Sequence, residues 1–110
     1  ELLKAWVTAP IDMSFIRDEL VLKAFSIWLA DPQAAITLFS AHEQLHQQQL
    51  EHFEEVQQKF ASSCAEQEMS YTSPQFGTYV TLKCGIEHEQ AYIRWCRWVV
   101  EQLEQANTTE

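Results

Sequence analysis

Glycine and proline are scarce in this chain of 110 residues, which contains only two Gly and three Pro. Both residue types end helices and form tight turns, so the chain has few places at which it reverses direction. Leu, Gln, Glu and Ala, which favour helices, are abundant instead. The composition therefore predicts one all-α domain over residues 1–110, a small bundle of about four helices.

Paired cysteines, excess basic charge and long apolar runs are lacking as well. Cys64, Cys84 and Cys96 show no metal-binding or redox spacing, so we expect no disulfide framework and a reduced, cytoplasmic setting. The net charge of -9 repels phosphate, which argues against nucleic-acid contact by this segment. Because Lys23 interrupts the most hydrophobic stretch, no membrane span is expected.

The three prolines predict most of the helix boundaries. Pro10 disfavours helix in the residue before it, so a first short helix should end near Thr8. Asp or Ser followed by Pro supplies an N-cap and a first helical residue, and this signal occurs twice, at 31–32 and 73–74. The expected later helices cover residues 14 to 30, 32 to 65 and 74 to 105. The expected apolar face of the first of these consists of Phe15, Leu22, Phe25 and Leu29.

The last helix carries apolar residues around more of its circumference than one neighbouring helix would bury. One seam, at heptad spacing, contains Tyr79, Leu82, Ile86, Glu89, Ile93, Cys96, Val100 and Leu103. A second stripe beside it contains His88, Tyr92, Trp95 and Val99. Together they cover roughly half of the helix, whereas a surface helix usually shows a stripe of about 100°. We therefore expect the chain's own core on one side of this helix and a partner chain on the other.

Residues 42 to 46, His-Glu-Gln-Leu-His, match a pattern in which two His bind zinc and Glu is the general base of a metalloprotease. His52 stands where a longer pattern has its third ligand, but Gln49 replaces the Gly that breaks the helix there. On an unbroken helix His52 points about 80° away from His42. A di-iron site also lacks its second Glu-x-x-His pair.

The same segment is explained without a metal if its His side chains lie beside the core. One apolar arc then contains Leu38, His42, Leu45, His46, Phe53, Val56 and Phe60. Partly buried imidazoles that form hydrogen bonds need no metal. A zinc-binding or metallohydrolase-like domain stays as the alternative interpretation.

Glu89 and Trp98 stand out on the last helix. A carboxylate in an apolar seam is costly unless it is paired, so we expect a partner for Glu89 among Arg17, Lys23 or a group on a second chain. The alternative is a loosely packed, hydrated seam. Trp98 borders the charged face, where an exposed Trp is typical of a partner surface or of a small-molecule pocket beside Trp95 and Trp98.

Three spacings together resemble a known family. They are Gly85-x-x-x-Glu89-x-x-x-x-x-Trp95, Leu3-x-x-Trp6-Val7-x-x-Pro10 and Arg17-Asp18-Glu19-Leu20-x-Leu22-Lys23-x-Phe25. In this order they are similar to the C-terminal helical domain of PadR-like transcriptional regulators, in the longer subfamily that includes virulence-gene activators. The resemblance covers nearly the whole chain, although the His-rich stretch from 42 to 52 departs from the family pattern.

The resemblance implies a dimerisation domain attached to an N-terminal winged helix that contacts DNA and is absent from this chain. The missing initiator Met and the acidic charge agree with such a fragment. Some family members respond to small molecules such as phenolic compounds, and none of the family's features is catalytic. We therefore expect a homodimer, DNA contact only through the absent domain and a small-molecule effector, with no enzyme activity, cofactor or metal. The expected interface or core residues are Tyr79, Gly85, Ile86, Glu89, Tyr92, Ile93, Trp95, Val99 and Val100.

Overall fold

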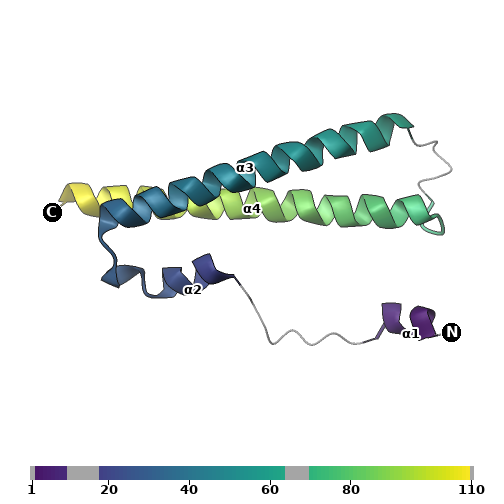
Figure 1. Cartoon of the computed structure of the whole chain (residues 1–110), viewed down its shortest axis with the longest axis horizontal. Coiled ribbons are helices and arrows are strands. Elements are labelled where there is room, and N and C mark those ends of the chain that lie inside the picture. The colour runs from purple at the N-terminus through teal and green to yellow at the C-terminus, as the bar shows by residue number, and fades with distance from the viewer. Residues whose placement is uncertain (1, 10–17, 64–69, 110) are drawn as a thin grey trace.

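A computed structural model describes residues 2–9, 18–63 and 70–109 of the chain (Figure 1). Within these ranges every regular element is helical and none is a strand. The elements are α1 (Leu2–Val7), α2 (Glu19–Phe25), the 3-10 helix η1 (Ile27–Leu29), α3 (Pro32–Ser63) and α4 (Pro74–Thr109). The prediction of an all-α fold with a long C-terminal helix is confirmed.

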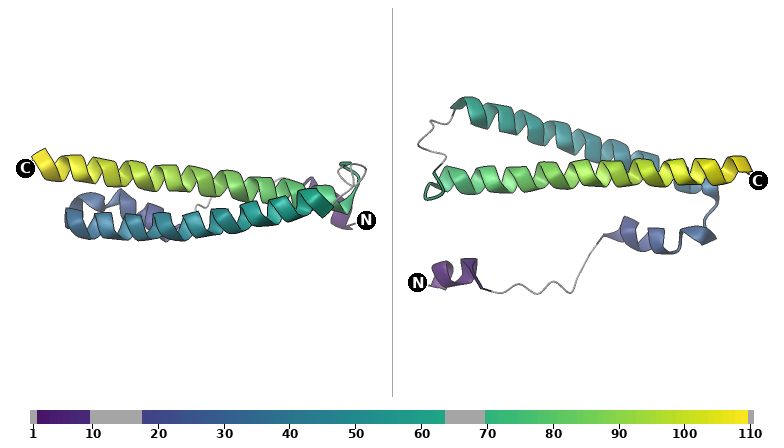
Figure 2. Two further views of the ribbon diagram at one scale, coloured as in Figure 1. Left: turned by 90° about the horizontal axis from the view of Figure 1, so that it is seen from above. Right: turned by 180° about the vertical axis from the view of Figure 1, so that it is seen from behind.

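The two long helices run antiparallel and form a hairpin, with α2 and η1 beside the end at which the chain terminates (Figures 1 and 2). The Cα atoms extend over 59 × 34 × 16 Å, with a radius of gyration of 19.1 Å. A compact domain of this length would have a radius of gyration of about 13 Å. The molecule is therefore long and thin, and much of its surface is the sides of helices.

The start signals of both long helices act as the sequence predicts. The Asp31 carboxylate accepts a hydrogen bond from the backbone N–H of Ala34 at 3.0 Å, and the Ser73 hydroxyl accepts one from Gln75 at 3.2 Å. Of the expected helix over 32 to 65, residues 64 and 65 lie outside the described residues. α4 continues to Thr109, beyond its expected end near residue 105. No helix in the described ranges is long and apolar enough to cross a membrane.

The helix expected over 14 to 30 is observed as the shorter α2 followed by η1, and the face that it buries differs from the predicted one. Asp18 caps α2 by accepting hydrogen bonds from the next turn, and the helix is interrupted at Ser26 before η1 begins. Leu20, Ala24 and Ile27 form the face that packs against the core. Of the expected face, Phe15 lies outside the described residues. Leu22, Phe25 and Leu29 are exposed.

Two clusters of buried side chains fill the space between the helices. The first lies at the α2 end of the hairpin and contains Leu20, Phe39, Tyr92, Cys96 and Val99. The second lies further along and contains Leu50, Leu82, Ile86 and Ile93. Beyond them, nothing in residues 51–62 of α3 or 74–81 of α4 is fully buried. Burial is therefore strongest at the α2 end and weakest near the α3–α4 connection.

Candidate functional site

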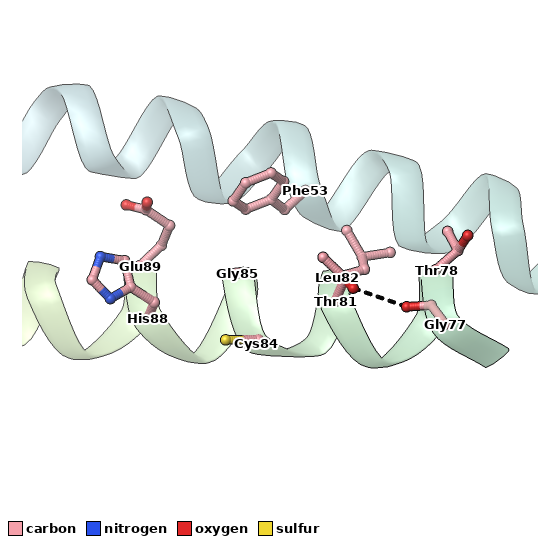
Figure 3. A pocket seen from close by; sticks show the side chains of 9 residues that line it. All are labelled: Phe53, Gly77, Thr78, Thr81, Leu82, Cys84, Gly85, His88 and Glu89. Carbon is pink, nitrogen blue, oxygen red and sulfur yellow. Dashed lines mark hydrogen bonds between the residues drawn. The ribbon is translucent and has the colours of Figure 1, made fainter. Parts of the chain in front are cut away.

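An apolar groove of about 810 Å³ lies along α4, close to the weakly buried end of the hairpin. Apart from Phe53 of α3, its lining comes from α4 alone (Figure 3). The lining residues of α4 are Gly77, Thr78, Thr81, Leu82, Cys84, Gly85, His88 and Glu89. Most of these side chains are small, so the groove exists because this stretch of α4 does not fill the space beside Phe53.

Gly85 allows Phe53 to lie against the α4 backbone. A Cβ atom at this position would be 3.0 Å from Cε2 and 3.3 Å from Cδ2 of the Phe53 ring. Ordinary van der Waals contact begins at a slightly longer distance, so an alanine here would displace the ring. Gly85 thus brings the α4 backbone into contact with a side chain of α3.

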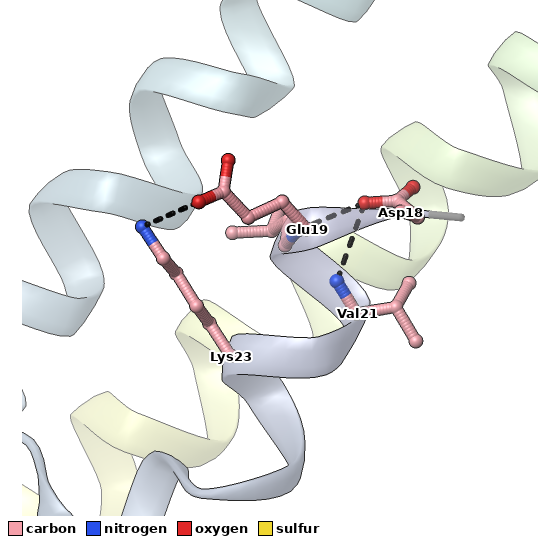
Figure 4. A network of polar contacts seen from close by, with 5 residues as sticks. Asp18, Glu19, Val21 and Lys23 are labelled. Carbon is pink, nitrogen blue, oxygen red and sulfur yellow. Dashed lines mark hydrogen bonds and ion pairs between the residues drawn. The ribbon is translucent and has the colours of Figure 1, made fainter. Parts of the chain in front are cut away.

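Glu89 lies at one end of the groove and is paired within the chain. Glu89 is 7 % exposed, and its carboxylate oxygen Oε2 forms a very short contact with Nδ1 of His46 on α3. The expectation that Glu89 has a partner is confirmed, and the partner among the described residues is His46, which was not one of the candidates. Lys23 instead pairs with Glu19 at 3.6 Å on the surface of α2, as Figure 4 shows, while Arg17 lies outside the described residues.

The polar contact continues from this pair to the start of α2. The Tyr92 ring stacks on the His46 ring with 3.9 Å between centroids, and the Tyr92 hydroxyl donates a hydrogen bond to Asp18 Oδ1 at 3.0 Å. The same Asp18 oxygen accepts the backbone N–H groups of Leu20 at 2.9 Å and Val21 at 3.3 Å (Figure 4). Three helices are therefore joined by one chain of polar and aromatic contacts.

Burial keeps two weak acids in this region neutral. It raises the pKa of the Tyr92 hydroxyl above its ordinary value, helped by the hydrogen bond to Asp18 and by its charge. Burial also raises the pKa of the Cys96 thiol to about 11, with smaller contributions from the negative charges of Glu43 and Asp18. Cys96 has no exposed surface, so its environment is that of an unreactive core thiol and not of a nucleophile.

The His-Glu-x-x-His segment is part of the helix–helix packing. The rings of His42 and His46 lie 6.5 Å apart between centroids, and Nδ1 of His46 is occupied by Glu89. The Glu43 carboxylate accepts a hydrogen bond from Nε of Arg97 at 3.0 Å. Within the described ranges no three His, Cys, Asp or Glu side chains gather as a metal site would require. The donor set does not fit the zinc site of the alternative interpretation.

The virulence activator alpha C-terminal family matches residues 16–104, which is most of the chain. The chain belongs to this family. The negative transcriptional regulator PadR of Bacillus subtilis (strain 168) is 30% identical over 89 residues, which cover 81% of this chain and 48% of that protein. The chain thus spans about half the length of this PadR-like relative.

Two solved structures of Bacillus subtilis PadR share the fold of this PadR-like domain. The one in complex with p-coumaric acid aligns with a TM-score of 0.79 and 23% identity, over 94% of this chain and 59% of that one. The one in complex with operator DNA aligns with the same TM-score of 0.79 and 24% identity, over 93% and 55%. The resemblance to the C-terminal domain of PadR-like regulators is confirmed.

In this PadR-like domain, the nine residues expected at an interface or core lie against α2 or α3 of the same chain. Ile86, Glu89, Tyr92, Ile93 and Val99 are buried. Half-buried are Tyr79, Gly85, Trp95 and Val100. On α3, Leu45 is exposed despite its place on the expected apolar arc. Most of the seam of α4 is consequently covered by α2 and α3 of its own chain.

Three of the four Trp side chains are exposed. They are Trp98, as predicted, and also Trp6 and Trp28. A small cavity of about 340 Å³ does lie beside Trp95 and Trp98. The larger groove at Gly85 was not predicted from the sequence. The signal that would have indicated it is a set of small residues on one side of the helix, at about 100° per residue: Gly77, Thr78, Thr81, Cys84 and Gly85.

Proposed function

We propose that this chain is the dimerisation domain of a PadR-like transcriptional regulator, acting in the cytoplasm through apolar packing and not through catalysis. One observation carries the proposal: large apolar side chains on two helices are left uncovered by the chain itself. Trp98 is 57% exposed on α4, and Phe25 is 89% exposed on α2. Exposed apolar patches of this kind are typical of interaction surfaces.

DNA contact is assigned to a segment outside this chain. The net charge of -9 disfavours contact with phosphates, so this domain would contribute spacing and symmetry instead of base recognition. The relative PadR has been solved with operator DNA, and this chain aligns with only 55% of it. A two-fold dimer would then place two DNA-binding segments on a palindromic operator.

Sedimentation velocity over a concentration series tests the dimer. We expect the sedimentation coefficient to rise with concentration towards that of two chains, and monomer at every concentration would contradict the proposal. Ile93→Glu, an obvious interface variant from the sequence, is unsuitable because Ile93 is 4% exposed within its own chain. Trp98→Glu is the sharper variant, and Glu104→Arg on the same helix is an exposed charge change that should leave association unaltered.

The groove beside Gly85 supports a second role, the sensing of a small aromatic effector. Its volume of about 810 Å³ falls in the range of roughly 300 to 1,000 Å³ usual for ligand pockets. The relative PadR has been solved with p-coumaric acid. In this chain the apolar lining would receive an aromatic ring, and the Glu89 carboxylate would accept a hydrogen bond from a phenol hydroxyl.

Binding of p-coumaric acid, followed by isothermal titration calorimetry, tests the effector role. Thr81→Trp places a large ring in the groove from an exposed position and should abolish binding. Glu104→Trp adds the same ring on the same helix outside the groove and should leave binding unchanged. Equal binding by both variants would show that the groove is not the effector site.

A further inference from the structure

The side of α4 that faces away from α3 carries its own line of residues at heptad spacing. Gly77, Cys84, Ala91 and Trp98 are seven residues apart and all exposed, and the half-exposed Val80 lies on the same side of the helix between Gly77 and Cys84. At about 100° per residue this line lies roughly opposite the buried seam. Figure 3 shows the Cys84 side chain on the face of α4 turned away from α3. We call these five residues the outer stripe of α4.

Opposite charges lie along one edge of the outer stripe. Glu87 and Arg94 are both exposed and are separated by two helical turns. Glu87 pairs with Lys83 at 3.0 Å within its own helix, and no described residue forms an ion pair with Arg94. If a second α4 runs antiparallel across this one, each Glu87 meets the Arg94 of the other copy. Such a pairing requires the two-fold axis to lie midway between the two residues, next to Ala91.

The side chains of the outer stripe have sizes that suit the same axis. Ala91, the smallest side chain near the midpoint, would sit at the crossing and allow the two helices to approach closely. Trp98 and Cys84 lie seven residues on either side of it, so the large indole of each copy would cover the small thiol of the other. An axis nearer His88 would bring the two Glu87 carboxylates together, and their repulsion disfavours that register.

We propose that the outer stripe of α4 binds the same stripe of a second copy, antiparallel, with the two-fold axis at Ala91. This assignment rests on the proposed dimerisation and names the surface and register that perform it. It leaves the buried seam between α3 and α4 intact. Because Cys84 also lines the groove, the Trp98 indole of each copy would lie at the rim of the other copy's groove.

Disulfide trapping tests the register. Ala91→Cys, made in a Cys64→Ser, Cys84→Ser background, should give a disulfide-linked dimer on oxidation, because two copies of an on-axis residue lie together. The control is Val80→Cys in the same background, an exposed residue of the same stripe. In the antiparallel register the two copies of residue 80 would be about 33 Å apart along the helices, since each is eleven residues from the axis at about 1.5 Å per residue.

The outcomes separate this inference from the proposed function. Linkage at Ala91→Cys alone supports the antiparallel stripe. Linkage at both positions indicates a parallel pair and overturns the register. Dimer in sedimentation without linkage at Ala91→Cys means that another face is used, so the inference fails while the proposed dimerisation stands. Monomer at all concentrations refutes the proposed dimerisation itself, and the inference with it.

A charge exchange tests the same register without cysteine. Glu87→Arg or Arg94→Glu alone should weaken dimerisation about tenfold, because two attractive pairs per dimer become repulsive. The double variant restores opposite charges and should recover the affinity of the wild-type chain. All three variants change exposed residues, so circular dichroism should show an unchanged fold. Additive weakening in the double variant would overturn the pairing of Glu87 with Arg94.

Discussion

Removal of His46 while Glu89 is kept should be among the most damaging single changes in this chain. His46→Leu leaves the buried carboxylate without its partner, and breaking a buried pair in this way usually costs about 3 to 5 kcal/mol. The side chain of His46 is 23% exposed, so water reaches part of the pair and the lower end of that range, about 3 kcal/mol, is expected. Loss of the stacking contact with Tyr92 acts in the same direction.

The matched variant removes both partners. In His46→Leu, Glu89→Leu no charge is left buried, and replacing a buried ion pair by apolar side chains is often neutral or stabilising. We therefore expect the double variant to be more stable than His46→Leu alone, with a coupling free energy of at least about 2 kcal/mol. Urea unfolding followed by circular dichroism at 222 nm, at one protein concentration and pH 7, gives the unfolding free energy of the wild-type chain, His46→Leu, Glu89→Leu and the double variant.

Two results would refute this reasoning. If the unfolding free energy of His46→Leu is within about 1 kcal/mol of that of the wild-type chain, the pair is solvated and the carboxylate needs no partner. If the losses of the two single variants simply add in the double variant, His46 and Glu89 act independently. Either result would favour the hydrated seam that the sequence analysis left open as an alternative.

Three further predictions follow from single contacts. Gly77→Ala, with open space around its new methyl group, should raise the unfolding free energy by about 0.5 to 1 kcal/mol. In the same urea assay the unfolding free energy of Gly85→Ala should be about 1 kcal/mol lower than that of Gly77→Ala, because the Phe53 ring of α3 must move. Equal changes in unfolding free energy for the two variants would contradict the close contact between Gly85 and Phe53. Tyr92→Phe should cost about 1 kcal/mol by removing the hydrogen bond to Asp18, and an unchanged urea midpoint would show that this bond does not anchor α2. Because burial raises the pKa of Cys96 from 9.0 to about 11, its contribution to stability is complete below pH 9 and is lost as the pH rises through about 11, by roughly 3 kcal/mol in total. Cys96→Ser should flatten this alkaline loss of stability in urea titrations from pH 8 to 11, and an equally steep loss would assign it to other groups.

The long helices could be predicted because their signals are local. Asp31 and Ser73 cap the helices that they begin, and the heptad seam of α4 is buried as its spacing indicates. The extent of α2 could not be predicted from spacing alone. Its start depends on Asp18, which is fixed both by its own cap and by a hydrogen bond from Tyr92, far away in the sequence.

The candidate site was harder to predict because it depends on how the two long helices are placed relative to each other. The apolar patterns of α3 and α4 show which faces meet but not which turns lie opposite. That offset decides that His46 reaches Glu89 and that Phe53 lies on Gly85. The sequence therefore indicates that Glu89 needs a partner but does not indicate that the partner is His46.

The uneven burial along the hairpin has a consequence for its dynamics. Neither buried cluster reaches beyond Leu50 on α3 or before Leu82 on α4, and residues 51–62 and 74–81 hold no fully buried side chain. Local opening needs the least free energy where the fewest apolar contacts must be broken, so the turns next to the α3–α4 connection should exchange their amide hydrogens first. The groove begins in those turns, at Gly77. A molecule that fills it would slow that exchange and lengthen the part of the hairpin that unfolds as a single cooperative unit.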